Sequence, residues 1–169
     1  MRTSFSRIAA VSGMCVAAMA LSTNAYAAPA APAAVQFAGS SATIADQALA
    51  KVGGYGGQCK EFVNGVVRKA TGGAASLGGG YYSDFQREGA RRVAAEDAVK
   101  GDVIQLNAAG SPDTFHRGMH TAIIVANLGN HTFKVVDSNF VSPNTVATHV
   151  WNPFERAVSK GLEVNIWRF

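Results

Sequence analysis

The sequence reads Tyr55-Gly56-Gly57-Gln58-Cys59-Lys60-Glu61-Phe62-Val63 where a glycine-rich turn passes into an amphipathic segment with a cysteine at its start. Apolar residues then recur at helical spacing, which predicts a core-facing helix that begins near Cys59 and ends at Gly72-Gly73. Free backbone N–H groups and the helix dipole favour a thiolate in the first turn. The same spacing puts Cys59 on the face of Phe62 and Val63, where a free cysteine packs as a small hydrophobe. The stretch alone is compatible with a nucleophile and with a core residue.

The N-terminus has the pattern of a secretory signal peptide. Arg2 and Arg7 precede an uncharged run from Ile8 to Leu21, and small residues flank a cleavage point after Ala27. The run is shorter than the roughly 20 apolar residues that a membrane span needs. We therefore expect residues 1–27 to be removed and the mature protein to be soluble, secreted or periplasmic, and not bound to a membrane.

Removal of the leader changes the cysteine count. The chain of 169 residues has two cysteines, and Cys15 lies inside the apolar run. Lipidation of Cys15 is not expected, because the preceding Met14 is not the small residue usual at that position. Cys59 is then the only thiol of the mature chain, so it cannot form an internal disulfide. A lone thiol is a liability in an oxidising compartment, which favours a functional role for Cys59.

The rest of the chain predicts one domain. Residues 28–40 are rich in Ala and Pro and uncharged, so we expect a disordered lead, followed by a catalytic domain over residues 41–169. Without the leader the chain has 13 basic and 11 acidic residues, a net charge of +2. That excess is too small to indicate a nucleic-acid partner.

Helical patterns come first and strand patterns follow. Besides the Cys59 helix, short helices are expected over 44–52, with Val52 on the apolar face, and over 82–89, and a mobile glycine-rich loop over 72–80. From Gly101 the pattern changes to five β-rich runs, at 102–106, 121–126, 132–137, 145–150 and 162–167. This order predicts an α+β fold in which the Cys59 helix packs on an antiparallel sheet or partial barrel.

A thiolate nucleophile needs an imidazole to exchange protons with, and a third polar group to orient that imidazole. His120 stands at the entry of the most apolar strand, where a polar ring is costly without a partner. His149, in a strand beside Trp151, is its rival. His116 belongs to a loop and His131 to a hairpin tip, where we expect it to be solvated.

A hairpin that turns at Gly129-Asn130 brings His120 close to Asp137-Ser138-Asn139. Strand residues two apart share a face, so Asp137 and Asn139 are expected to point the same way. Either side chain can accept the imidazole N–H. Asp-Ser-Asn is also an ordinary way to end a strand in a turn.

The order of these motifs resembles the CHAP family of cysteine, histidine-dependent amidohydrolases and peptidases. The motifs are Gln-Cys at a helix start, Gly-x-x-His-x-Ala-Ile-Ile at a strand start and Asp-x-Asn at a strand end, within about residues 41–151. The resemblance implies a papain-like, NlpC-like fold with Cys59, His120, Asp137 and Asn139 as catalytic residues. The family usually has Glu at the position of Asp137, so either Asp137 or Asn139 orients the ring.

The resemblance further implies a cysteine peptidase or amidase that hydrolyses amide bonds of peptidoglycan or its peptide fragments, acting as a monomer without a cofactor. The Cys59 backbone N–H and the Gln58 side chain are the candidate oxyanion donors. Aromatic side chains expected to contact the substrate are Tyr55, Tyr81, Tyr82 and Trp151. Tyr81 and Tyr82 stand at a helix start, where aromatic residues more often pack on the core than contact a substrate.

No metal is expected. Some family members bind calcium through two aspartates before the nucleophile turn, and here Ala50 and Val52 offer no side-chain oxygen. The histidines lack the spacings of zinc motifs. Two other functions stay open: acyl transfer as in a transglutaminase, which uses the same Cys, His and acid order, and a non-catalytic wall-binding or inhibitor module.

Overall fold

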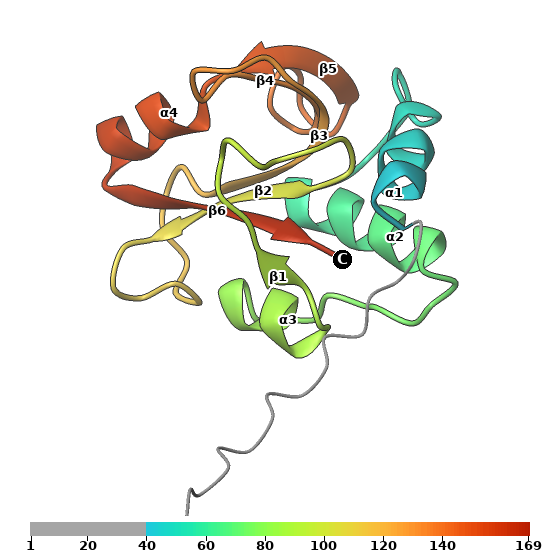
Figure 1. Cartoon of the computed structure of the whole chain (residues 1–169), viewed down its shortest axis with the longest axis horizontal. Helices are drawn as coiled ribbons and strands as arrows, with labels where there is room; N and C mark the ends of the chain where they lie inside the picture. The colour runs from blue at the N-terminus through green and yellow to red at the C-terminus, as the bar shows by residue number, and fades with distance from the viewer. Residues whose placement is uncertain (1–39) are drawn as a thin grey trace, which may run out of the picture. The chain divides into compact units, whose positions relative to one another are not determined.

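A six-stranded antiparallel sheet organises residues 40–169, the part of the chain that the computed structural model describes (Figure 1). The spatial order is β1-β6-β2-β3-β4-β5. The strands are β1 (Arg91–Arg92), β2 (Val103–Ala108), β3 (His120–Asn127), β4 (Phe133–Ser138), β5 (Val146–Trp151) and β6 (Leu162–Arg168). The predicted α+β class with an antiparallel sheet is confirmed, and each of the five predicted strands is present. The signal peptide and residues 28–39 of the lead lie outside the described residues.

Four helices accompany the sheet in this part of the chain: α1 (Ser40–Leu49), α2 (Cys59–Ala70), α3 (Tyr82–Arg87) and α4 (Pro153–Lys160). The helix at Cys59 begins and ends as predicted. The first helix was placed too late, because α1 already includes Ser40 and ends at Leu49. Beyond it the chain turns, and Val52 is 46% exposed instead of lying on the apolar face.

Helix α4 was not among the helices predicted from the sequence. The Asn152 side chain accepts hydrogen bonds from the backbone N–H groups of Phe154 and Glu155, and Pro153 occupies the first turn. Gly161 ends the helix with a φ of 64°. These are ordinary start and stop signals for a helix, so the sequence did contain the information.

Alternate residues of the central strands enter two separate apolar cores. Val103 and Ile123 pack with the buried face of α2, which includes Val66. Ile104 and Ile124, one position further on, belong to the second core together with Ala157 of α4. The period-2 alternation of strands produces this division. The sheet therefore holds α2 against β3 and β4, the strands that contain His120 and Asp137.

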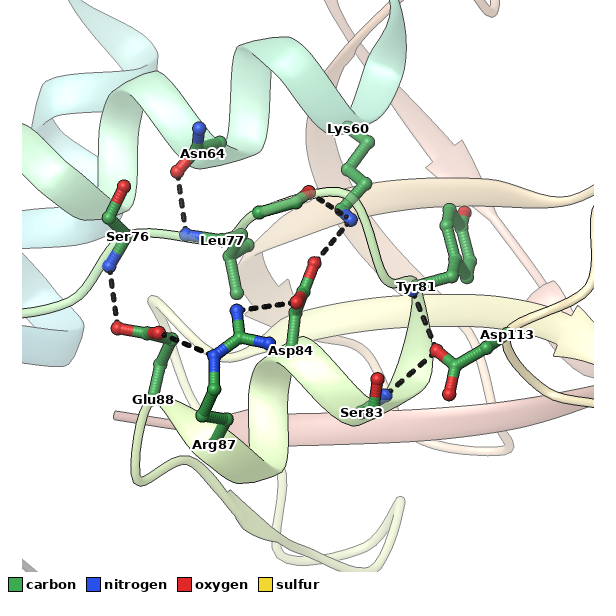
Figure 2. Close-up of polar contacts among 11 residues, drawn as sticks. Lys60, Asn64, Ser76, Leu77, Tyr81, Ser83, Asp84, Arg87, Glu88 and Asp113 are labelled. Carbon is green, nitrogen blue, oxygen red and sulfur yellow. Dashed lines mark hydrogen bonds and ion pairs between the residues drawn. The ribbon is translucent and has the colours of Figure 1, made fainter.

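The glycine-rich segment 72–80 is tied to both neighbouring helices, contrary to the predicted mobile loop. Asn64 of α2 accepts a hydrogen bond from the Leu77 N–H at 2.8 Å, and Glu88 accepts one from the Ser76 N–H at 2.9 Å. Lys60 donates to the Gly78 carbonyl and forms an ion pair with the buried Asp84 of α3 at 2.7 Å (Figure 2). The loop thus joins α2 to α3 through side-chain contacts at three points.

The start of α3 is fixed by Asp113, from the connection between β2 and β3. Its Oδ1 accepts hydrogen bonds from the backbone N–H groups of Tyr81 and Ser83, at 2.7 and 2.9 Å (Figure 2). The Lys60 ammonium also lies 5.6 Å from the centre of the Tyr81 ring. These contacts hold the Tyr81 side chain close to the beginning of α2.

Helix α1 approaches the chain closely at Gly101, just before β2, and a substitution at Gly101 tests this contact. Its φ is 94°, and a Cβ there would lie 1.6 Å from the backbone oxygen of Ser41. We expect Gly101→Ala to lower the free energy of unfolding by about 3 kcal/mol, from backbone strain and the clash together. Gly110 has a φ of 71° with no atom within 4 Å of a built Cβ, so Gly110→Ala should cost only about 1 kcal/mol. Equal costs in urea unfolding would contradict this packing.

Candidate active site

Cys59 is the first residue of α2 and is half-buried. The turn before it is closed by Glu61, whose carboxylate accepts a hydrogen bond from the Gln58 backbone N–H at 3.0 Å. The thiol therefore lies where the helix presents unpaired backbone N–H groups, which favour a negative charge. The structure places Cys59 as the sequence predicted.

The pKa of the Cys59 thiol is below its ordinary value. Burial acts first and raises this pKa. A hydrogen bond to His120, the charge of that ring and hydrogen bonds with Thr121 lower it, and together they outweigh burial. Thr121 was not singled out in the sequence, although it follows His120 directly, and strand alternation points it to the face on which α2 packs.

His120 is only 5% exposed, and its Nε2 lies 2.8 Å from Oδ2 of the fully buried Asp137. Burial lowers the pKa of His120, but hydrogen bonds to Asp137 and Cys59 and the charges of both groups raise it to about 9. Because Nε2 contacts Asp137, Nδ1 is the ring nitrogen left for the thiol. The three side chains thus form a continuous chain of contacts, from thiol to imidazole to carboxylate.

Asn139, the other candidate for orienting His120, lies elsewhere. Strand β4 ends at Ser138, and Asn139 has a φ of 70°, so the expectation that Asp137 and Asn139 share a face was wrong. The Asn139 amide donates to Gln58 Oε1 at 2.9 Å, and its oxygen accepts from the Asn144 N–H at 3.0 Å. Asp137 contacts the imidazole, whereas Asn139 holds the residue before the cysteine.

His149, the rival histidine, lies near the same carboxylate oxygen as His120. Its Nε2 is 3.7 Å from Asp137 Oδ2, too long for a hydrogen bond, and its ring stacks on Phe140 at 4.4 Å. Burial lowers the pKa of His149, the charge of Asp137 raises it, and the charge of His120 lowers it. His131 is exposed, 3.3 Å from Glu96, and His116 is exposed in its loop.

The four predicted substrate-binding aromatic residues have different surroundings. Tyr55 is 82% exposed, whereas Trp151 is buried, with its ring centre 5.6 Å from that of His120 and the two ring planes at 82°. Tyr82 packs on Trp167, with the ring centres 5.0 Å apart. Tyr81 lies near the thiol. Burial and the charge of Cys59 raise the pKa of the Tyr81 hydroxyl, and Thr121 lowers it by less, so this pKa is raised overall. The raised pKa keeps the buried hydroxyl of Tyr81 neutral beside the nucleophile.

Gln58, the predicted side-chain oxyanion donor, is exposed. Because its Oε1 accepts the hydrogen bond from Asn139, its side-chain N–H₂ is the end that remains to donate. Residues 40–169 contain no group of three or more His, Cys, Asp or Glu side chains that could hold a metal ion. In the same part of the chain no helix is long and apolar enough to cross a membrane.

Comparisons with known proteins give few similarities. No protein-family model and no curated protein matches the chain. Among solved structures, it is similar to the crystal structure of Ly7917 at 15% identity, over 73% of this chain and 60% of that chain, with a TM-score of 0.46. For Ly7917 with the hydrolyzing product of MDP the identity is 14%, the shares are 73% and 61%, and the TM-score is 0.47. Similarities of this size leave both the fold family and the activity undefined.

The pKa shifts predict how Cys59 reacts with iodoacetamide as pH changes. Below pH about 9 His120 carries a positive charge that stabilises the thiolate. The midpoint, which is the pH at which the alkylation rate reaches half its maximum, should therefore lie below the pKa of an ordinary thiol in the wild type. His120→Ala removes the hydrogen bond and the positive charge that lower the thiol pKa, so the midpoint should rise by at least one pH unit, on the order of the shifts that a neighbouring charge causes. His131→Ala, which removes an exposed ring, should leave the midpoint unchanged. A wild-type midpoint equal to that of His120→Ala would contradict the contact.

Proposed function

We propose that the chain is a secreted or periplasmic cysteine peptidase or amidase on a papain-like, CHAP-type fold, and that it hydrolyses amide bonds of peptidoglycan. The observation that carries the proposal is the contact chain from the Cys59 thiol through His120 to Asp137. A lowered thiol pKa beside a raised imidazole pKa is what a thiolate–imidazolium pair requires. The peptidoglycan substrate is supported by the motif resemblance alone.

In the proposed mechanism the Cys59 thiolate attacks the carbonyl carbon of the substrate amide and forms a tetrahedral intermediate. The intermediate collapses as the C–N bond breaks, and the His120 imidazolium gives its Nδ1 proton to the leaving amine. A thioester on Cys59 remains. Neutral His120 then takes a proton from water, which attacks the thioester and releases the carboxylic acid and the thiolate. Asp137 keeps its contact with Nε2 through both steps.

The developing oxyanion would be stabilised by the Cys59 backbone N–H, at the start of α2, and by the Gln58 side-chain amide. One such donor is commonly worth about 3 kcal/mol in the transition state. The hydrogen bond from Asn139 to Gln58 Oε1 turns the amide so that its N–H₂ can donate. In this mechanism Asn139 acts by positioning Gln58 and has no contact with the reacting atoms.

The direct test is digestion of purified peptidoglycan with the mature protein, with Cys59→Ala and with Cys59→Ser, followed by mass spectrometry of the fragments. The wild type should release fragments with new carboxyl and amino ends, at a rate at least about 10³-fold above either variant, because the nucleophile is lost. Both variants should keep the wild-type circular dichroism spectrum and melting temperature.

The same digest separates the other two functions. A labelled amine added to the reaction would be incorporated by an acyl transferase, whereas hydrolysis leaves free carboxyl groups. Identical fragments from the wild type and Cys59→Ala, or none from either while the wild type still binds the wall, would overturn the proposal.

A further inference from the structure

A pocket of about 780 Å³ with basic walls lies beside the N-terminal end of β3. It is formed by the segment before His120 and by α4, and its lining residues are His116, Arg117, Gly118, Arg156, Ser159 and Lys160. Three of the six residues, Arg117, Arg156 and Lys160, have basic side chains, and none has a carboxylate side chain. The proposed chemistry at Cys59 assigns no role to this pocket.

Arg156 connects the pocket to the candidate active site. Its Nε donates a hydrogen bond to the Gly118 carbonyl at 3.2 Å, and its guanidinium carbon lies 5.1 Å from the centre of the Phe140 ring. The His120 ring centre is also 5.1 Å from that of Phe140. The guanidinium carbon and the imidazole centre are therefore no more than about 10 Å apart. Cation–π contact and hydrogen bond together hold the guanidinium in place.

The other two cations of the pocket are Arg117 and Lys160. Within residues 40–169, neither Arg117 nor Lys160 forms an ion pair. The Lys160 stem packs over Gly118, where a Cβ would lie 3.3 Å from its Cγ. Glu155, the acidic residue of α4, accepts a hydrogen bond from the Asn152 side chain and does not line the pocket. Three like charges gathered without a carboxylate among them repel one another unless an anion joins them.

We propose that this pocket is an anion subsite that binds a carboxylate of the substrate peptide. An extended peptide advances about 3.3–3.6 Å per residue, so a separation of at most about 10 Å corresponds to no more than about three residues from the scissile amide. Guanidinium groups suit a carboxylate because they can donate two parallel hydrogen bonds. The inference rests on the proposed function and adds to it a substrate class, peptides that carry a free carboxylate at that distance.

The test compares two forms of one short wall peptide, with its carboxylates free or converted to carboxamides. The variant Arg117→Gln/Lys160→Gln removes two exposed charges and leaves Arg156 on Phe140. We expect the KM of this variant for the carboxylate peptide to be about tenfold higher than that of the wild type at low salt, because two partly exposed ion pairs with the substrate are lost. The kcat should stay within about twofold of the wild-type value. KM for the carboxamide peptide should not change. Arg91→Gln/Arg92→Gln, which removes two exposed charges at the far edge of the sheet, should alter neither.

Equal rises in KM for both peptides, or no rise for either, would overturn the subsite. Calorimetry with Cys59→Ala in place of the active enzyme separates this failure from failure of the proposed hydrolysis. Tighter binding of the carboxylate peptide than of the carboxamide, lost in the Arg117→Gln/Lys160→Gln background, supports the subsite even if the wild type cleaves neither peptide. Equal binding of the two peptides to Cys59→Ala would overturn it whatever the wild type cleaves.

Discussion

A hydrogen bond between two buried side chains, His120 and Asp137, is the contact on which the candidate site depends. An unpaired imidazole or carboxylate in this position would carry a large desolvation cost. The hydrogen bond between the two side chains offsets part of that cost for each of them. Burial lowers the pKa of His120, but Asp137 and Cys59, through their hydrogen bonds and charges, raise it to about 9. The bond to Asp137 also occupies Nε2, which leaves Nδ1 for the Cys59 thiol. The lowered pKa of that thiol, to which His120 contributes, therefore depends on Asp137, which the thiol does not touch.

The fold supports this contact from two directions. The β3–β4 hairpin brings the start of one strand to the end of the other, and the residues after Asp137 then hold the turn that carries the cysteine. The Ser138 hydroxyl donates to the Gly57 carbonyl at 2.8 Å. Gly56 passes so close to β4 that a Cβ there would lie 2.5 Å from Ser138 Oγ. The nucleophile and the end of β4 are thus fixed to each other, which favours a preorganised site over one assembled on binding.

The sequence predicted those parts of the molecule that local patterns determine. Apolar spacing placed the helix at Cys59 and the five strands, and the turn at Gly129-Asn130 placed His120 beside Asp137. Asn139 could not be assigned, because its left-handed conformation follows from where the strand ends, and strand ends are set by tertiary contacts. The basic pocket could not be predicted from the sequence either, since Arg117 and Arg156 line one pocket only because α4 packs on β6 and β2. Helix α4 itself was signalled by Asn152, Pro153 and Gly161.

The effect of Asp137 on the ionisation of His120 can be measured directly by NMR titration of the histidine ring protons. His120 in the wild type should titrate with a pKa of about 9, well above that of an ordinary histidine. In Asp137→Asn, which keeps an acceptor oxygen but removes the charge, the pKa should fall by more than one unit, whereas Asn139→Ala should leave it within a few tenths. A wild-type value near 6.5 that is insensitive to Asp137→Asn would contradict the account.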